Sequence, residues 1–232
     1  MPENYIGIMC GTSLDSLDFS LCCFEKVKKL KTFKSYRINQ KLKDKINLCK
    51  TKPNNQSLFN ETDEEVTRFI IHSLHKFIIF SKIKKIKAIG YPGITLVHNP
   101  NKCISKTLGN LKMIAAKTNL KVIGDFRLSD MKAGGQGAPL APYFHEYISL
   151  KEKPFINILN LGGFANWTFK SGNKLIAYDT GPANYLIDLI SNRYFNVPYD
   201  RNGLLAKKGK INDEALVAML SDKFFDQAIP KS

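Results

Sequence analysis

The chain has 232 residues, a mean hydropathy of −0.21 and a formal net charge of +15 at pH 7. This composition excludes a disordered or fibrous chain, and the length is enough for one compact unit or two smaller domains. The positive charge comes from 30 lysines and only 5 arginines. Because nucleic-acid readers favour arginine, which binds phosphate and guanine through paired hydrogen bonds, this balance indicates a solvated surface.

Nucleic-acid binding stays open as an alternative, since the lysine-rich runs 26–31 and 82–87 could form a basic stripe. The five cysteines form neither CxxC pairs nor a cluster with histidine, which argues against zinc and against a disulfide framework. No apolar run is long enough to span a bilayer, and the N-terminus lacks a signal-peptide pattern. We therefore expect a soluble protein of a reducing cytoplasm, with no membrane and no nucleic acid as partner.

The chain opens with the pattern of a β-hairpin. Residues 5–9 predict a buried strand, the glycine-containing segment 11–16 a turn, and residues 18–24 the returning strand. A further strand is predicted over residues 31–37. The first glycine turn is therefore expected at the tip of a hairpin.

A polar loop over residues 50–56 and then a helix that begins at Thr62 are predicted next. Thr62 can cap the helix, with Glu65 three residues later completing a capping box. His72 and His75 lie three apart on this helix, but without a third ligand nearby we assign them no chemistry. The apolar residues that recur at helical spacing, and are expected in the core, are Val66, Phe69, Ile70, Leu74, Phe77 and Ile78.

The following segments alternate between strands and helices. Residues 86–90 and 121–123 predict short strands, and residues 112–118 a helix between them. The second strand is expected to deliver residues 124–127 to a loop. This alternation indicates an α/β protein.

Three glycines fall within residues 133–139, which predicts a hinge or a loop of close backbone approach. We place a domain boundary here, giving domains of residues 1–132 and 133–232.

The second domain is predicted to start with a hairpin, formed by residues 155–161 and 167–169. A strand over residues 174–178 should end at Asp179. Two helices follow. The first covers residues 185–194, and the second covers residues 211–225 with Asn212 as a cap. The residues expected on the inner side of the first helix are Leu186, Ile187, Ile190 and Tyr194.

The glycine-centred stretches 7–15, 160–166 and 178–184 follow probable strands, which suggests phosphate chemistry. Glycine permits the backbone to turn tightly and lets N–H groups approach an anion. In the first stretch, hydroxyls could hold phosphate and a carboxylate could reach a metal-bound water. A polar hairpin turn with side-chain caps would explain the same residues. The stretch is not a P-loop, because the GKS/T ending is missing.

Asp179 stands at a predicted strand end, where open α/β sheets bind ligands. The stiff segment 180–182 that follows suits a positioned general base. An Asx turn that leads into the next helix explains the local sequence equally well. Arg127 and Asp130, just after another strand, leave the same two interpretations open.

Five motifs occur together in a recognisable order. Residues 7–18 resemble the GIMSGTSLDGxD start of the anhydro-N-acetylmuramic acid kinase family, and residues 125–130 resemble its DFRxxD. Residues 133–145 are similar to its AGGQGAPLxPxFH, residues 160–166 to its NxGGxAN, and residues 179–184 to its DTGPxN. The resemblance spans essentially the whole chain.

The resemblance implies an α/β protein with the two-domain ATPase fold of actin, Hsp70 and sugar kinases. It implies ATP and Mg²⁺ as cofactors and a sugar bound in the cleft between the domains. The family's reaction opens 1,6-anhydro-N-acetylmuramic acid by hydrolysis and phosphorylates it, giving N-acetylmuramic acid 6-phosphate, a step in cell-wall sugar recycling. Such a reaction belongs to the cytoplasm.

The resemblance also implies roles for single residues. Asp179 would be the catalytic base that deprotonates the attacking water, and Asp15 the residue that holds Mg²⁺ through water. The residues that would bind the nucleotide phosphates are Gly11, Thr12, Ser13, Leu14, Asp15, Ser16, Leu17, Asp18, Gly162 and Gly163. The residues that would face the sugar are Arg127, Asp130, Gly181, Pro182 and Asn184.

The sequence departs from the family pattern at several positions. Cys10 and Ser16 replace serine and glycine, and Pro92 and Ile94 replace a histidine and a glutamine of the motif GxHGQTVxH. Losing two hydrogen-bonding side chains points to altered sugar recognition. Residues 230–232 match the start of the family's PKSTGRE motif, so the second domain is expected to be incomplete.

Three hypotheses follow. The chain is a fragment of an anhydrosugar kinase, or such a kinase completed by a complementing C-terminal polypeptide; a homodimer is the other assembly considered. Alternatively, it is a non-catalytic relic or binding module of the same fold. The third hypothesis is a kinase for another anhydrosugar, such as levoglucosan.

Overall fold

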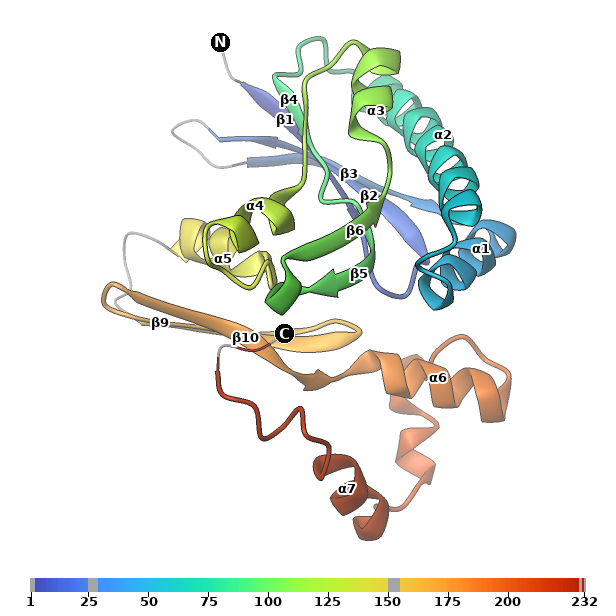
Figure 1. The fold of residues 1–232 in the computed structure, drawn as a ribbon, viewed down its shortest axis with the longest axis vertical. Coiled ribbons are helices and arrows are strands. Elements are labelled where there is room, and N and C mark those ends of the chain that lie inside the picture. Colours follow the sequence, from blue (N-terminus) through green and yellow to red (C-terminus); the bar gives the residue numbers. More distant parts are fainter. Residues whose placement is uncertain (1–2, 25–28, 150–154, 230, 232) are drawn as a thin grey trace. The chain divides into compact units, whose positions relative to one another are not determined.

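The protein is described by a computed structural model that covers residues 3–24, 29–149, 155–229 and 231. Part of the lysine-rich run 26–31 and two residues of the segment 230–232 therefore lie outside the described residues. The fold is mixed α/β, and its backbone contacts divide the chain into two units, Met1–Gly137 and Ala138–Ser232 (Figure 1). Each unit is considered by itself.

The first unit is built on a five-stranded mixed sheet in the order β3-β2-β1-β4-β7. Strands β1, β2 and β3 are antiparallel neighbours, whereas β4 pairs parallel to both β1 and β7. The predicted hairpin and the α/β class are thus confirmed. The strands of this sheet are β1 (Asn4–Cys10), β2 (Ser16–Cys23), β3 (Lys29–Arg37), β4 (Ala88–Gly90) and β7 (Val122–Ile123).

Alternation along the hairpin strands sorts their side chains between two faces. Ile6 and Ile8 of β1, with Leu17 and Phe19 of β2, are buried on one face. Helices α1 (Gln40–Thr51) and α2 (Gln56–Ser81) lie side by side next to this sheet (Figure 1), and residues of both belong to the same core.

The start of α2 differs from the prediction. The helix begins at Gln56, and the side chain of Asn55 caps it by accepting a hydrogen bond from the Leu58 N–H. Thr62 lies inside the helix, fully buried, and its hydroxyl donates to the Leu58 carbonyl at 2.6 Å. Threonine within a helix commonly bonds back to the carbonyl four residues earlier. A threonine with a glutamate three residues later can therefore match the capping-box pattern without starting a helix. The predicted loop 50–56 is shorter in the structure: α1 ends at Thr51 and α2 begins at Gln56, so the loop covers residues 52–55.

The rest of the first unit consists of short elements. Strands β5 (Ile94–Asn99) and β6 (Ile104–Leu108) form a separate hairpin, with the 3₁₀ turn Pro100–Lys102 between them. Helix α3 (Leu111–Thr118) is confirmed. The predicted loop at residues 124–127 is wrong in part, because helix α4 (Phe126–Lys132) begins there. Asp125 precedes it in a left-handed conformation, with φ at 55°.

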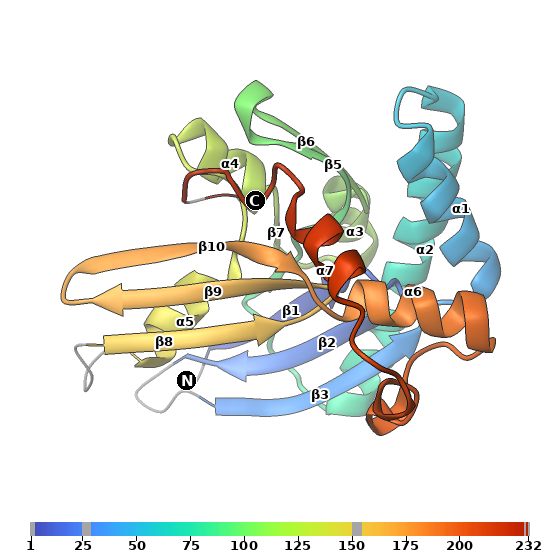
Figure 2. The same cartoon turned by 90° about the horizontal axis from the view of Figure 1, so that it is seen from below.

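The second unit contains a three-stranded antiparallel sheet in the order β10-β9-β8 (Figure 2). Helix α5 (Ala141–Ser149) contacts β8 and β9. The predicted end of the third strand at residue 178 is wrong, since β10 continues past Asp179 with a bulge before Gly181. Its elements after α5 are β8 (Phe155–Leu161), β9 (Phe164–Ser171), β10 (Lys174–Pro182), α6 (Asn184–Phe195), the 3₁₀ turns Arg201–Gly203 and Ala206–Lys208, and α7 (Asp213–Leu220).

The helices of the second unit carry apolar residues that are not covered. Helix α6 forms as predicted, but Ile187, Ile190 and Tyr194, which were expected on its inner side, are exposed, Tyr194 at 70%. Helix α7 is capped by Asn212 as predicted, yet it ends at Leu220 instead of residue 225. The predicted inner side of α6 is therefore wrong for these three residues, because periodicity alone cannot tell whether another element packs on an apolar face.

We predict that the stability of the first unit depends on α2. Ile70→Ala should lower its free energy of unfolding by about 2–5 kcal/mol, because Ile70 is fully buried and the replacement leaves a cavity. The matched control Ile79→Ala, on the same helix but 77% exposed, should change it by less than about 0.5 kcal/mol.

The measurement is urea unfolding followed by circular dichroism at the helix band. Tryptophan fluorescence would not serve, because the single tryptophan, Trp167, lies in the second unit. Equal effects of the two substitutions would contradict the assignment of this helix face to the core.

Candidate active site

The turn between β1 and β2 exposes its polar residues because a leucine anchors it. Leu14 adopts φ of 57° and is buried to 1% exposure, and its N–H donates to the Gly11 carbonyl at 3.1 Å. Gly11, Thr12 and Ser13 are exposed beside it. Leu14 and Leu17, both predicted to bind phosphate, are core residues, so their side chains are not available to a ligand.

Asp15 is held on the exposed side of this turn. Its carboxylate accepts a hydrogen bond from Lys43 Nζ of α1 at 2.7 Å, and its side chain is 69% exposed. Partial burial opposes ionisation, but the hydrogen bonds from Lys43 and Ser13 keep the pKa of Asp15 below its usual value. Asp18 accepts a hydrogen bond from the Ser16 hydroxyl at 2.8 Å. The turn therefore presents hydroxyls and an ionised carboxylate.

Arg127 and Asp130 of α4 hold the glycine-rich loop that closes the first unit. Arg127 Nη1 donates to the Gly137 carbonyl at 2.8 Å, and the Gly137 N–H donates to Asp130 Oδ2 at 2.7 Å. A Cβ at Gly135 would lie 2.1 Å from Asp130 Oδ2, so this position requires glycine. The two predicted sugar-facing residues thus act together on the loop backbone.

His98 of β5 is a further anchor of this loop, which we did not single out from the sequence. Its Nε2 lies 2.9 Å from the Gln136 carbonyl. Because a carbonyl only accepts, Nε2 carries the proton and Nδ1 is an acceptor in the neutral ring. Nδ1 is buried, and among the described residues it has no hydrogen-bond partner. The hydroxyl of Ser105, which pairs with His98 across the β5–β6 hairpin, is in the same state.

The departures at residues 92 and 94 have a structural reading. Ile94 is buried in the core of the first unit together with Tyr91, whose hydroxyl donates to the Leu108 carbonyl at 2.9 Å. The apolar residue at position 94 therefore contributes packing. Pro92 is half-buried next to them.

In the second unit, the glycine turn between β8 and β9 is bonded to the start of α6. The N–H groups of Ala183 and Asn184 donate to the carbonyls of Gly163 and Gly162 at 2.9 and 3.0 Å. The Asn184 side chain donates to the Leu161 carbonyl at 3.1 Å. The predicted phosphate and sugar residues of this unit are therefore neighbours.

Asp179 lies within β10, opposite Asn166 of β9, directly before the bulge. Its N–H donates to the Lys231 carbonyl at 2.8 Å. Gly181 follows with φ of 143°, a conformation that side chains rarely adopt, and the Phe225 ring packs within 3.2 Å of where its Cβ would stand. The strand is thus fixed on both sides of the candidate base.

Asn166 is a second residue that sequence reasoning did not single out. Its Oδ1 is buried and unpaired within the described part of the chain, and its strand position faces Asp179. It is the last residue of the NxGGxAN motif, and this position in the motif could have identified it as a candidate site residue.

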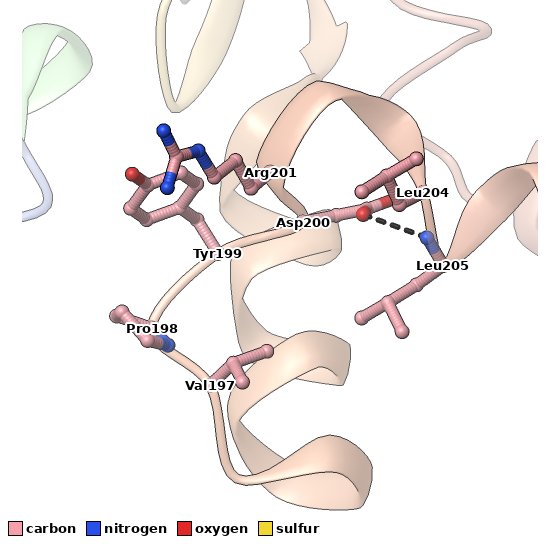
Figure 3. Close-up of a pocket in the computed structure, with 7 residues that line it drawn as sticks. All are labelled: Val197, Pro198, Tyr199, Asp200, Arg201, Leu204 and Leu205. Carbon is pink, nitrogen blue, oxygen red and sulfur yellow. Dashed lines mark hydrogen bonds between the residues drawn. The ribbon is translucent and has the colours of Figure 1, made fainter.

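The predicted residues fall into two groups, one in each unit. In the first unit they occupy the β1–β2 turn and α4, and in the second the β8–β9 turn and the end of β10. A separate open pocket of about 330 Å³ follows α6 (Figure 3). None of the predicted residues lines it, and the residues that do are Val197, Pro198, Tyr199, Asp200, Arg201, Leu204 and Leu205.

The described residues contain neither a membrane-spanning helix nor a cluster of metal-binding side chains. No helix among them is long and apolar enough to cross a bilayer. No three histidine, cysteine, aspartate or glutamate side chains in that part of the chain gather as a metal site would require.

Comparison with known proteins identifies the family. The anhydro-N-acetylmuramic acid kinase profile matches residues 3–232. The chain belongs to this family. Its relatives include the anhydro-N-acetylmuramic acid kinases of Sulfurovum sp. (strain NBC37-1), 40% identical over 235 residues, and of Sulfurimonas denitrificans, 38% identical over 237 residues.

The alignments with these two kinases cover 99% and 100% of this chain but 65% and 64% of theirs. The chain thus spans less than two thirds of their length. Among solved structures, a ROK family transcriptional regulator aligns over 96% of this chain and 57% of its own, with 11% identity and a TM-score of 0.44. A similarity this weak supports no functional argument.

We predict that His98 makes the stability of the first unit depend on pH. Burial, and then the nearby Arg127 charge, lower the pKa of His98 from 6.5 in the folded protein. The unfolded chain therefore binds the proton more readily. The stabilisation is complete above about pH 6.5 and is lost as the pH falls through the lowered folded value.

Urea unfolding of the first unit between pH 7 and pH 5 measures this dependence. His98→Gln retains a donor for the Gln136 carbonyl but cannot titrate, so it should reduce the slope of stability against pH. His72→Gln, on an exposed helix face, should retain the wild-type slope. If His98→Gln keeps the wild-type slope of stability against pH, protonation of His98 is not coupled to folding.

Proposed function

We propose that this chain is the nucleotide- and sugar-binding part of an ATP-dependent kinase that converts 1,6-anhydro-N-acetylmuramic acid to N-acetylmuramic acid 6-phosphate. The observation that carries the proposal is the family match over residues 3–232. It is supported by the exposed polar turn of the first unit and by the strand that carries Asp179 in the second. We also propose the two-domain fold of sugar kinases, with domains of residues 1–132 and 133–232.

In the proposed reaction, Asp179 accepts a proton from the water that attacks the anomeric carbon. The new bond forms between this water oxygen and C1, while the bond between C1 and O6 breaks. The freed O6 attacks the γ-phosphorus of ATP, and ADP leaves. Asn166, opposite Asp179 on the neighbouring strand, offers a buried acceptor that can orient the same water.

The nucleotide phosphates are proposed to bind at the first turn, through the N–H groups of Gly11–Ser13 and the hydroxyls of Thr12 and Ser13. Gly162 and Gly163 of the second unit are proposed as further phosphate-binding residues. Mg²⁺ fits Asp15, whose carboxylate is ionised and exposed, and would neutralise phosphate charge when bound. Phosphate oxygens and water would supply its other ligands.

Arg127 and Asp130 of the first unit are proposed as sugar-binding residues, and so are Gly181, Pro182 and Asn184 of the second unit. Arg127 and Asp130 act by fixing the loop at Gly137. Because Pro92 and Ile94 replace hydrogen-bonding residues of the family pattern, a different anhydrosugar such as levoglucosan is the second candidate substrate.

We predict that Asp179→Asn abolishes product formation, reducing turnover by at least about a hundredfold, because the amide cannot accept the proton. Asp226→Asn, an exposed aspartate of the same unit, should retain wild-type activity. The assay mixes purified chain, ATP, Mg²⁺ and either anhydrosugar, and detects the phosphorylated sugar by mass spectrometry. Equal activity of the two variants would exclude Asp179 as the base.

We further propose that the active protein includes a polypeptide corresponding to the last third of the relatives. The uncovered apolar residues of α6 and α7, including Ile190, Tyr194 and Val217, support such a partner, since patches of this kind mark interfaces. If the folded chain alone shows no activity, two hypotheses remain: the chain needs this polypeptide, or it has a non-catalytic role.

We therefore predict that adding the last third of the Sulfurovum relative, expressed separately, increases turnover by at least about tenfold. Tyr194→Lys should reduce this gain, because the added charge would have to be buried in the interface. If the added polypeptide neither binds nor activates the chain, as judged by size-exclusion chromatography and the same assay, this partner is excluded. Dimerisation of the chain alone would then be the remaining arrangement.

A further inference from the structure

A group of cationic side chains surrounds the β1–β2 turn, and none of them was predicted to have a function. Lys43 and Lys50 both lie on α1, two helical turns apart and therefore on one face of the helix. Arg37, at the end of β3, pairs with Ser16 in the sheet, and its charge acts on Asp15. The turn that carries Gly11–Ser13 is thus bordered by positive charge.

Lys43 and Lys50 differ in their partners. Lys43 is paired with Asp15 at 2.7 Å. Lys50 is half-buried, and no ion pair or hydrogen bond of its amine occurs with any described residue. Its electrostatic neighbours are Cys10, at the end of β1, and Lys43.

Neither neighbour balances the Lys50 charge. Burial raises the pKa of Cys10 to about 12, so its thiol is neutral at physiological pH. Lys43 is itself a cation. Burial, with the repulsion from Lys43, lowers the pKa of Lys50 from its usual value. The last turn of α1 offers the amine only partial negative charge from helix carbonyls.

An unpaired, half-buried cation is costly, and an anion placed next to it removes the cost. Lys43, seven residues earlier on the same face of α1, reaches Asp15 of the turn at 2.7 Å, so this face of α1 borders the turn on which Gly11, Thr12 and Ser13 are exposed. A polyphosphate bound at this turn would interact with the backbone donors of the turn and with the ammonium group of Lys50.

We propose that Lys50 is a phosphate-binding residue of the nucleotide site, and that Lys43 positions Asp15 at the same site. The proposal rests on the proposed function, because it assumes that the triphosphate of ATP occupies the β1–β2 turn. It adds a contact from α1, an element to which no motif of the chain assigned a role.

The test is calorimetric titration of the full chain with Mg·ATP and with inorganic tripolyphosphate at physiological ionic strength. Lys50→Gln should weaken binding of both probes by about tenfold or more, as expected for loss of one charged contact. Lys50→Arg should retain most of the affinity. The matched control Lys41→Gln, an exposed lysine of the same helix with the same change in net charge, should weaken binding less than about twofold.

A second measurement does not depend on the folding of a variant. In wild-type chain, the ¹³Cε resonance of Lys50 reports its protonation, and its pKa should rise when tripolyphosphate is added. A pKa that does not move, or equal losses of affinity in Lys50→Gln and Lys41→Gln, would overturn the role of Lys50.

The outcomes separate this inference from the proposed function. Binding that depends on Lys50 without any phosphoryl transfer to sugar would uphold the phosphate site and exclude the kinase activity of the chain. Transfer with wild-type affinity in Lys50→Gln would uphold the kinase and exclude Lys50. A folded chain that binds neither probe would exclude the phosphate site at Lys50, and the kinase proposal would then be decided by the assay with the added polypeptide.

Discussion

The burial of Leu14 beneath the β1–β2 turn is the constraint on which the first unit's candidate site depends. A hairpin tip is usually mobile, because few side chains pack against it. Here the turn is fixed from below by a leucine that belongs to the same core as α1 and α2. Its left-handed backbone costs some free energy, which the buried side chain offsets. The exposed residues Gly11–Ser13 are therefore held in one arrangement, as phosphate binding requires.

A second constraint fixes the loop before the second unit. Arg127 donates to the Gly137 carbonyl, and Asp130 accepts from the Gly137 N–H. His98 bonds to the carbonyl of the preceding residue, Gln136. Three side chains from two elements thus hold a loop that glycine would otherwise leave flexible. Helix α4 brings Arg127 and Asp130 to one face, because residues three apart in a helix are neighbours.

The second unit has the opposite character. Its sheet and glycine turns are well bonded around Asp179, but α6 and α7 expose many large apolar side chains. The cost of exposing apolar surface to water grows with its area, so these helices gain stability when something covers them. The candidate base therefore lies in a unit whose polar interactions are more complete than its hydrophobic packing.

The sequence alone predicted the family, the β1–β2 and β8–β9 hairpins and helices α2, α3, α6 and α7, because glycine-centred motifs and apolar periodicity are local patterns. It also predicted Asn212 as a cap, a contact within one turn. It did not predict α1, α4, α5 or the β5–β6 hairpin. It misplaced the start of α2, because Thr62 can bond either forward as a cap or backward within a helix, and only packing decides. Only the tertiary structure showed that, among the described residues, His98 Nδ1, Asn166 Oδ1 and the Lys50 amine have no partner. Whether a polar group has a partner depends on residues distant in the chain, and no local pattern of residues records those distances.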